Sequence, residues 1–262
     1  MATSLGEDVV YEEPPAVEHV RKMAAKALNC KDADFTEGFG LTFLQLGAAA
    51  FLICSVFLFT RAAASPYSRR HFFWPLIFAT FSTGAAYFAM SQDQGWALSH
   101  GCRQLFVARF ADWSIAHSCI VVALGFIAGA DTSDVASGVG FSLLTTVAFG
   151  AGALSWSPLA RWLWFFLGLI FLGLMLFVLL VVFKETASSK TAELEALYSN
   201  LSIMVVACMA VYALVWLFSQ GFHSFSLTFE ISLHLALDFI TRIFVSAQVV
   251  LASSLLDYCN PT

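Results

Sequence analysis

The chain is poor in charged residues, and that scarcity sets its class. Only 12% of its 262 residues are Asp, Glu, Lys or Arg, whereas 59% are hydrophobic. Soluble domains carry about 25% charged residues, so the composition predicts a membrane protein whose main partner is the lipid bilayer. No basic stripe occurs along the chain, which argues against a nucleic-acid partner.

Lysine is missing from the apolar part of the chain. None occurs between Lys31 and Lys184 or after Lys190. Nucleotide-binding loops and catalytic-triad patterns are missing as well, so we expect no enzyme. No spacing of cysteine and histidine indicates a metal site.

Seven segments are long and apolar enough to cross a bilayer, which takes about 20 residues each. Joined by short loops, they predict an all-α membrane protein, a bundle of seven transmembrane helices. The predicted spans are 38–60, 72–92, 104–130, 135–160, 162–183, 196–222 and 231–256. We therefore divide the chain into an N-terminal tail (1–37), a seven-helix domain (38–257) and a short C-terminal tail (258–262).

The N-terminal tail has helical periodicity. Val17, Val20, Ala24 and Leu28 share one face, opposite charged residues. The pattern fits a short amphipathic helix at the membrane surface, and a partly ordered tail equally well. Positive charges nearly balance on the two sides of the membrane. The short loops favour an N-terminus outside, extracellular or lumenal.

Two cysteines fall on the same side of the predicted membrane. Cys30 lies in the tail and Cys102 in the loop between the second and third spans. They form a disulfide if that side is oxidising, and otherwise stay free. Cys54, Cys119 and Cys208 fall within spans, where we expect apolar packing.

Two predicted spans contain ionisable residues. Arg109 and Asp112 lie three apart in the third span and so share a face. Four ionisable residues recur at every fourth position of the last span: Glu230, His234, Asp238 and Arg242. Charges inside a membrane are functional candidates by default. The alternative is a structural network in which Asp112 and Asp238 neutralise Arg109 and Arg242.

The motifs around these charges carry a family resemblance. Residues 109–113 read Arg-Phe-Ala-Asp-Trp, and residues 237–242 read Leu-Asp-Phe-Ile-Thr-Arg. Both resemble signatures of the microbial (type I) rhodopsins of the bacteriorhodopsin-like kind, in whose third helix the Asp is the counterion of a retinal Schiff base. Tyr87 resembles the tyrosine that hydrogen-bonds the second counterion, and Glu230 a position near the extracellular proton exit. The resemblance spans residues 38–257 and implies the family's seven-helix fold with an outside N-terminus.

The chain departs from the family at the central position. Arg242 stands where the family carries its retinal-binding lysine. A guanidinium does not condense with an aldehyde and stays protonated in proteins, so we expect no covalently bound cofactor. Ala116 and Ala123 replace a hydroxyl and a carboxylic proton donor of the family's pumps, and Met209 replaces a tryptophan that sandwiches the polyene.

The resemblance also implies a residual pocket of the retinal type. Its matching residues are Trp113, Ile120, Phe165, Met209, Tyr212 and Trp216, with Arg242 at the lysine position. Such a pocket holds retinal, a carotenoid or a lipid non-covalently, or else Arg242 fills it and pairs with Asp112 and Asp238. We favour the filled pocket. His117, an unusual neighbour there, is interpreted as a hydrogen-bonded interior histidine.

These features favour a light-independent, opsin-like integral membrane protein. It would act as a scaffold, a complex subunit or a regulatory module. Glycines in the fourth and fifth spans are compatible with a homo-oligomer or a membrane-protein complex. One alternative is a retinal-dependent light-driven ion pump, channel or photosensor, with non-covalent chromophore or with Arg242 an engineered change. Another is a light-independent ion or proton transporter.

Overall fold

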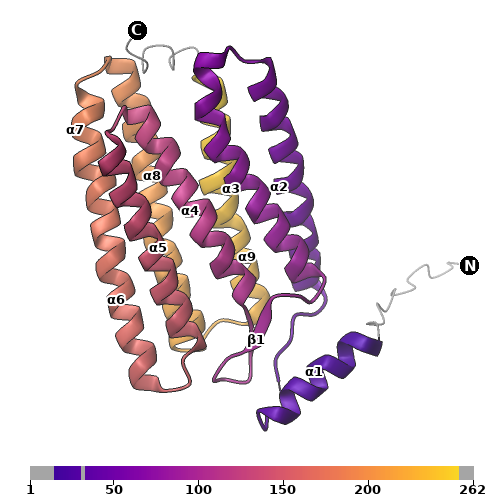
Figure 1. Cartoon of the computed structure of the whole chain (residues 1–262). Helices are drawn as coiled ribbons and strands as arrows, with labels where there is room; N and C mark the ends of the chain where they lie inside the picture. Colours follow the sequence, from indigo (N-terminus) through magenta and orange to yellow (C-terminus); the bar gives the residue numbers. More distant parts are fainter. Residues whose placement is uncertain (1–14, 31–32, 254–262) are drawn as a thin grey trace, which may run out of the picture.

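Seven long helices make up most of the structure, a computed structural model that describes residues 15–30 and 33–253 (Figure 1). The first four spanning helices are α2 (Phe39–Ala64), α3 (Tyr67–Ser91), α4 (Val107–Ala128) and α5 (Thr132–Leu154). The fifth joins α6 (Pro158–Phe177), a π-helical turn (Val178–Val182) and α7 (Phe183–Ser188). The sixth joins α8 (Ala192–Trp216) and a π-helical turn (Leu217–Gly221). The seventh joins α9 (Leu227–Asp238), a π-helical turn (Phe239–Phe244) and α10 (Val245–Leu251).

These helices run up and down in chain order and close into a ring. Each of the helices α2, α3, α4 and α5 packs on the next helix along the chain. Helix α9 packs on both α8 and α2, which closes the ring. Short connections enforce this order, since only Ser65 and Pro66 separate α2 from α3. The predicted seven-helix bundle is therefore confirmed.

A small hairpin caps one end of the bundle. Strands β1 (Trp96–Leu98) and β2 (Gln104–Phe106) pair antiparallel between α3 and α4. We call this the hairpin end, and the opposite end, where the α2–α3 turn lies, the far end. The predicted third span is wrong at its start, because residues 104–106 form a strand of this hairpin and the helix begins at Val107.

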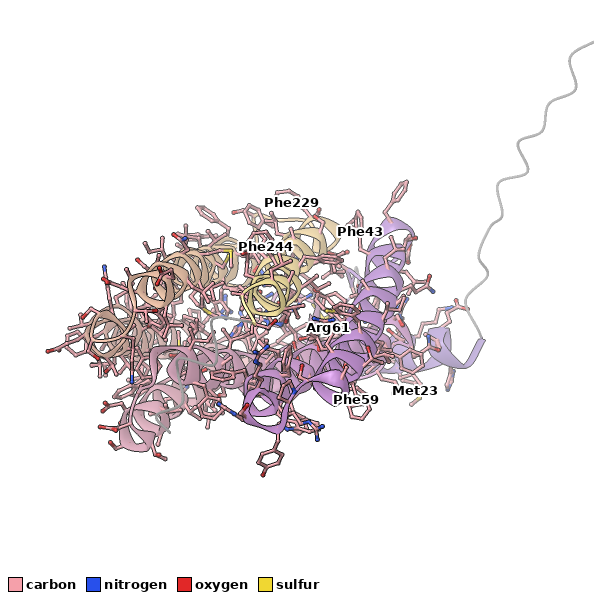
Figure 2. The ribbon with its side chains drawn as sticks, turned by 90° about the horizontal axis from the view of Figure 1, so that it is seen from above. Met23, Phe43, Phe59, Arg61, Phe229 and Phe244 are labelled. Atoms are coloured by element: carbon pink, nitrogen blue, oxygen red, sulfur yellow. A yellow bond between two sulfur atoms is a disulfide. The ribbon has the colours of Figure 1, made fainter. Side chains whose placement is uncertain are left out.

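The amphipathic pattern of the tail does form a helix, α1 (Pro15–Ala27), which lies beside the hairpin end (Figure 1). Arg21, one of the charged residues opposite the apolar face, is buried and pairs with Asp93 at 2.9 Å. A disulfide between Cys30 and Cys102 ties the tail to the hairpin. Val20 and Met23 remain exposed on α1, where Figure 2 labels Met23.

Apolar side chains cover the outside of the bundle as well as its core. Figure 2, which looks along the bundle, shows Phe229 at its outer edge. Other exposed apolar residues on the spanning helices include Ile53, Phe81, Leu163 and Ile170. An apolar surface of this extent is what a hydrocarbon environment requires of a spanning helix. The chain is thus a multi-pass integral membrane protein.

The observed helix limits differ from the predicted spans at several ends. The second span begins at Tyr67, before the predicted residue 72, and the fourth ends at Leu154, before the predicted residue 160. Pro158 instead opens the fifth helix, a position that proline favours because its missing N–H is not needed there. Residues 254–257 of the predicted domain and the tail over 258–262 lie outside the described residues.

Candidate functional site

A guanidinium lies at the centre of the bundle. The side chain of Arg242 is fully buried on the π-helical turn of the seventh helix. Its Nη1 lies 2.9 Å from Asp238 Oδ1, and its Nη2 lies 3.7 Å from Asp112 Oδ2. Its Nε donates to Thr83 Oγ1 at 2.8 Å, and Nη1 also donates to the Tyr212 hydroxyl at 3.1 Å. We call Arg242 and these partners the inner network.

Hydroxyl groups hold both carboxylates of the inner network. Asp238 accepts from Tyr87 at 2.8 Å and from Tyr212 at 2.5 Å. Asp112 accepts from Ser82 at 2.8 Å and from Thr83 at 3.0 Å. Hydrogen bonds of this kind stabilise an ionised carboxylate away from water. Two carboxylates therefore face one guanidinium, and the hydroxyls supply the remaining donors.

A second cluster lies nearer the hairpin end. Glu230 on α9 is buried and accepts from Arg109 Nη1 of α4 at 2.6 Å. Arg103 of the hairpin pairs with the other oxygen of Glu230 at 2.9 Å. Gln220 Nε2 donates to the same carboxylate, and His234 Nδ1 lies 2.8 Å from the Glu230 carbonyl oxygen. We call this the outer network.

The two networks change the predicted pairing. The sequence predicts that Arg109 helps to neutralise Asp112 and Asp238, but Arg109 forms its ion pair with Glu230. That choice places Arg109 in the outer network and leaves Arg242 as the guanidinium beside Asp112 and Asp238. The sequence reasoning also missed Ser82, Thr83 and Arg103. Thr83 had a signal, because it precedes Tyr87 by one helical turn and so shares its face.

Only part of the predicted retinal-type pocket lines a cavity. A cavity of about 20 Å³ lies between α4, α5, α6 and α8. Its lining consists of Trp113, His117, Ser142, Thr145, Thr146, Phe149, Leu172, Met175, Met209 and Tyr212. The other predicted pocket residues, Ile120, Phe165, Trp216 and Arg242, are buried but do not line it. Trp216 instead stacks on Phe165 with ring centroids 4.8 Å apart.

The lining of this cavity is partly polar. His117 Nε2, Ser142 Oγ and Trp113 Nε1 are buried without a hydrogen-bond partner among the described residues. The expected hydrogen bond of His117 is therefore not formed at this nitrogen, and the His117 ring stacks on Trp113. A cavity of this size has room for about one water molecule. A polyene would need the walls of this cavity to move.

No cluster of three or more His, Cys, Asp or Glu side chains suited to a metal ion occurs in the described part of the chain. A retinal Schiff base would need a primary amine, and Arg242 presents none.

Comparison with known proteins agrees with the fold. Residues 39–252 match the family model described as bacteriorhodopsin-like protein. Sensory rhodopsin-2 of Natronomonas pharaonis is 27% identical over 207 residues, which cover 78% of this chain and 85% of that protein. A bacteriorhodopsin-II-like protein of Haloquadratum walsbyi is 24% identical over 232 residues, covering 85% of this chain and 94% of its own length.

Solved structures give the same fold. The light-driven proton pump LR (Mac) of Leptosphaeria maculans superposes with a TM-score of 0.82 at 20% identity, covering 87% of this chain and 99% of that one. Cyanorhodopsin N2098R of Calothrix sp. NIES-2098 gives a TM-score of 0.82 at 22% identity, covering 86% of this chain and 100% of that one. The family match extends over most of the chain and includes both charged networks, so the chain belongs to the bacteriorhodopsin-like family of microbial rhodopsins.

Proposed function

We propose that this chain is a light-independent member of its family, an opsin-like membrane protein that forms no retinal Schiff base. The observation that carries the proposal is the bonding of Arg242, whose guanidinium is buried among Asp112, Asp238, Thr83 and Tyr212. A guanidinium neither condenses with an aldehyde nor gives up its proton under ordinary conditions. The inner network then acts as a fixed structural centre of the bundle.

The cavity supports the same proposal. Its volume of about 20 Å³ suits a water molecule better than a long apolar ligand, and three of its polar atoms have no hydrogen-bond partner among the described residues. Non-covalent retinal, carotenoid or lipid would have to displace the side chains around Met209 and Tyr212. The alternative of a pigment with non-covalent retinal is therefore less favoured by the packing.

We further propose that the protein works through contacts with other membrane proteins or with a second copy of itself. Of the glycines noted in the fourth and fifth spans, Gly138, Gly150, Gly152 and Gly168 already pack against neighbouring side chains of the bundle. A Cβ on Gly140 or Gly173 would meet nothing within 4 Å. These two positions on α5 and α6 leave space for a close helix contact.

The disulfide supports an orientation for this proposal. Disulfides form and persist in oxidising compartments. The pairing of Cys30 with Cys102 thus favours a hairpin end that faces the extracellular or lumenal side.

Absorption spectroscopy tests the loss of pigment formation. The parent chain, an Arg242→Lys variant and an Arg61→Lys control are purified with all-trans-retinal, and visible spectra are recorded before and after hydroxylamine. We expect the parent and the control to stay colourless, because Arg61 is exposed in the last turn of α2 and a lysine there has no pocket. A visible band with a light response in the parent would overturn the proposal. A band that appears only in Arg242→Lys would show that this one side chain removes the photochemistry.

A further inference from the structure

The hairpin end of the bundle holds more buried positive than negative charge. Arg103, Arg109 and Arg161 are each at most 6% exposed, and the buried carboxylate beside them is Glu230. Asp34 lies 3.9 Å from Arg103, but its side chain is 57% exposed. Among the described residues, Glu230 is thus the one buried carboxylate that pairs with any of these three guanidinium groups. A buried charge without a counter-charge is unfavourable unless something else pairs with it.

The uncompensated guanidinium is that of Arg161 in the first turn of α6. Glu230 is already occupied by Arg103 and Arg109. Among the described residues, no carboxylate lies within ion-pair distance of Arg161. Its Nη1 contacts His223 Nε2 at 3.3 Å, and its Nη2 is enclosed without a hydrogen-bond partner.

The side chains beside Arg161 reach the surface of the protein on one side. His223, which covers the guanidinium, is itself solvent-exposed, as is His100 nearby. A Cβ on Gly101 would come within 3.3 Å of the His223 ring, so the hairpin closes over the other side. Arg103 also lies close enough to His223 to repel a proton on its ring. The site thus combines exposed side chains as its cover, an Arg161 N–H group without a hydrogen-bond partner among the described residues, and an excess of buried positive charge.

We propose that a small monovalent anion of the halide class, with chloride as the physiological candidate, binds at Arg161 Nη2 beneath His223. The enclosed nitrogen favours a small ion over a phosphate or a peptide carboxylate. Arg103 adds long-range attraction without direct contact. This site is separate from the inner network and does not depend on a pigment or on the proposed function.

Two measurements test the site. In the first, crystals of the parent protein are grown in bromide, and anomalous diffraction locates the ion. We expect a peak within hydrogen-bond distance of Arg161 Nη2. Bromide elsewhere, or none at all, would overturn the proposal whatever the behaviour of variants.

In the second, the thermal unfolding midpoint is followed while chloride replaces gluconate at constant ionic strength. The parent midpoint should rise with chloride and saturate, as expected for a ligand that binds the folded state. Arg161→Gln should weaken the apparent chloride affinity about tenfold or more, because a charge-assisted hydrogen bond is lost. Arg61→Gln, which removes an exposed arginine near the far end, should respond as the parent does. An equal chloride response in parent and Arg161→Gln would contradict the proposal.

Discussion

At the scale of single residues, Thr83 connects the two charged groups of the inner network. Its hydroxyl donates to Asp112 and accepts from Arg242 Nε. One small side chain thus satisfies a carboxylate and a guanidinium that sit 3.7 Å apart and are not directly hydrogen-bonded.

Replacing Thr83 with valine keeps the shape and removes the hydroxyl. Arg242 Nε then loses its acceptor in a fully buried site. We expect a loss of about 1–3 kcal/mol in the free energy of unfolding, measured by denaturant titration in mixed micelles. Thr60→Val is the matched control, because Thr60 is exposed and bonds only its own helix; it should change stability by less than about 0.5 kcal/mol. Equal effects in both variants would show that the Thr83 hydroxyl is unimportant.

His223 gives the hairpin end a dependence on pH. Partial loss of water around its ring, followed by the charges of Arg161 and Arg103, lowers the pKa of His223 below its ordinary value. In the unfolded chain the ring gains a proton near pH 6.5, whereas in the folded chain it stays neutral to lower pH. The unfolded state then binds more protons, so this contribution to stability falls as the pH drops below about 6.5.

His223→Asn removes that titration. Above pH 7, we expect the difference between the thermal unfolding midpoints of parent and variant not to change with pH. Between pH 6.5 and pH 5, we expect the midpoint of the parent to fall further than that of the variant. The chloride concentration must be held constant, since the proposed ion lies beside this ring. A parallel fall in both proteins would assign the acid sensitivity to other groups.

The sequence predicted which charged residues form the site better than it predicted the partners of the longest side chains. Asp112, Asp238 and Arg242 were predicted because charged residues inside membrane spans are functional candidates and because Asp238 and Arg242 lie one helical turn apart. The partner of Arg109 was not found, since its long side chain can extend toward either end of the bundle. Its partner Glu230 also bonds Arg103 and Gln220. Those two residues lie in the hairpin and at the end of the sixth span, so no helical spacing relates them to Arg109.

At the scale of elements, Glu230 connects its own helix, α9, to three other parts of the fold. Its carboxylate joins α9 to Arg109 of α4, to Arg103 of the hairpin and to Gln220 at the end of the sixth span. Glu230→Gln leaves Arg109 without its negative partner and Arg103 with only the exposed Asp34 at 3.9 Å. We expect a loss of about 3–5 kcal/mol in unfolding free energy. Glu37→Gln, at an exposed position, serves as the control and should unfold like the parent.

The disulfide and the Arg21–Asp93 pair hold α1 against the hairpin. Cys30→Ser removes the disulfide, which joins two cysteines that lie 72 residues apart in the sequence. We expect destabilisation of about 2–4 kcal/mol and faster proteolysis within residues 15–38. Cys54→Ala, which alters a free cysteine in α2, should keep the parent's protection. Unchanged cleavage in Cys30→Ser would mean that the ion pair alone holds the helix.

Helix existence was easier to predict than helix ends. Hydropathy identified each span because about 20 consecutive apolar residues exceed the length typical of a buried helix in a soluble core. It missed the start of α3, where Arg69 and Arg70 continue the helix beyond the apolar stretch. It also missed the hairpin, because strands of three residues such as Trp96–Leu98 are too short to show an alternating pattern.

At the scale of the whole molecule, the bundle leaves a small cavity among residues of the predicted retinal-type pocket. The cavity beside Trp113 and Met209 measures about 20 Å³. We therefore expect all-trans-retinal to leave the thermal unfolding midpoint of the parent unchanged. A ligand of the folded state at 100 times its Kd would add about 2.7 kcal/mol. A midpoint that climbs with retinal concentration would reveal a pocket that opens to accept it.

The inner network also has an electrical consequence. A guanidinium holds its proton at any ordinary pH, and Tyr87, Tyr212, Ser82 and Thr83 fasten its carboxylate partners. Moving one elementary charge across the bilayer changes the energy by about 2.3 kcal/mol per 100 mV. Because these charged groups are held by hydrogen bonds, we expect a change in voltage not to displace them. The centre of the protein should then be electrically silent, giving no transient current after a voltage step, while it still sets a constant electrostatic potential along the middle of the bundle.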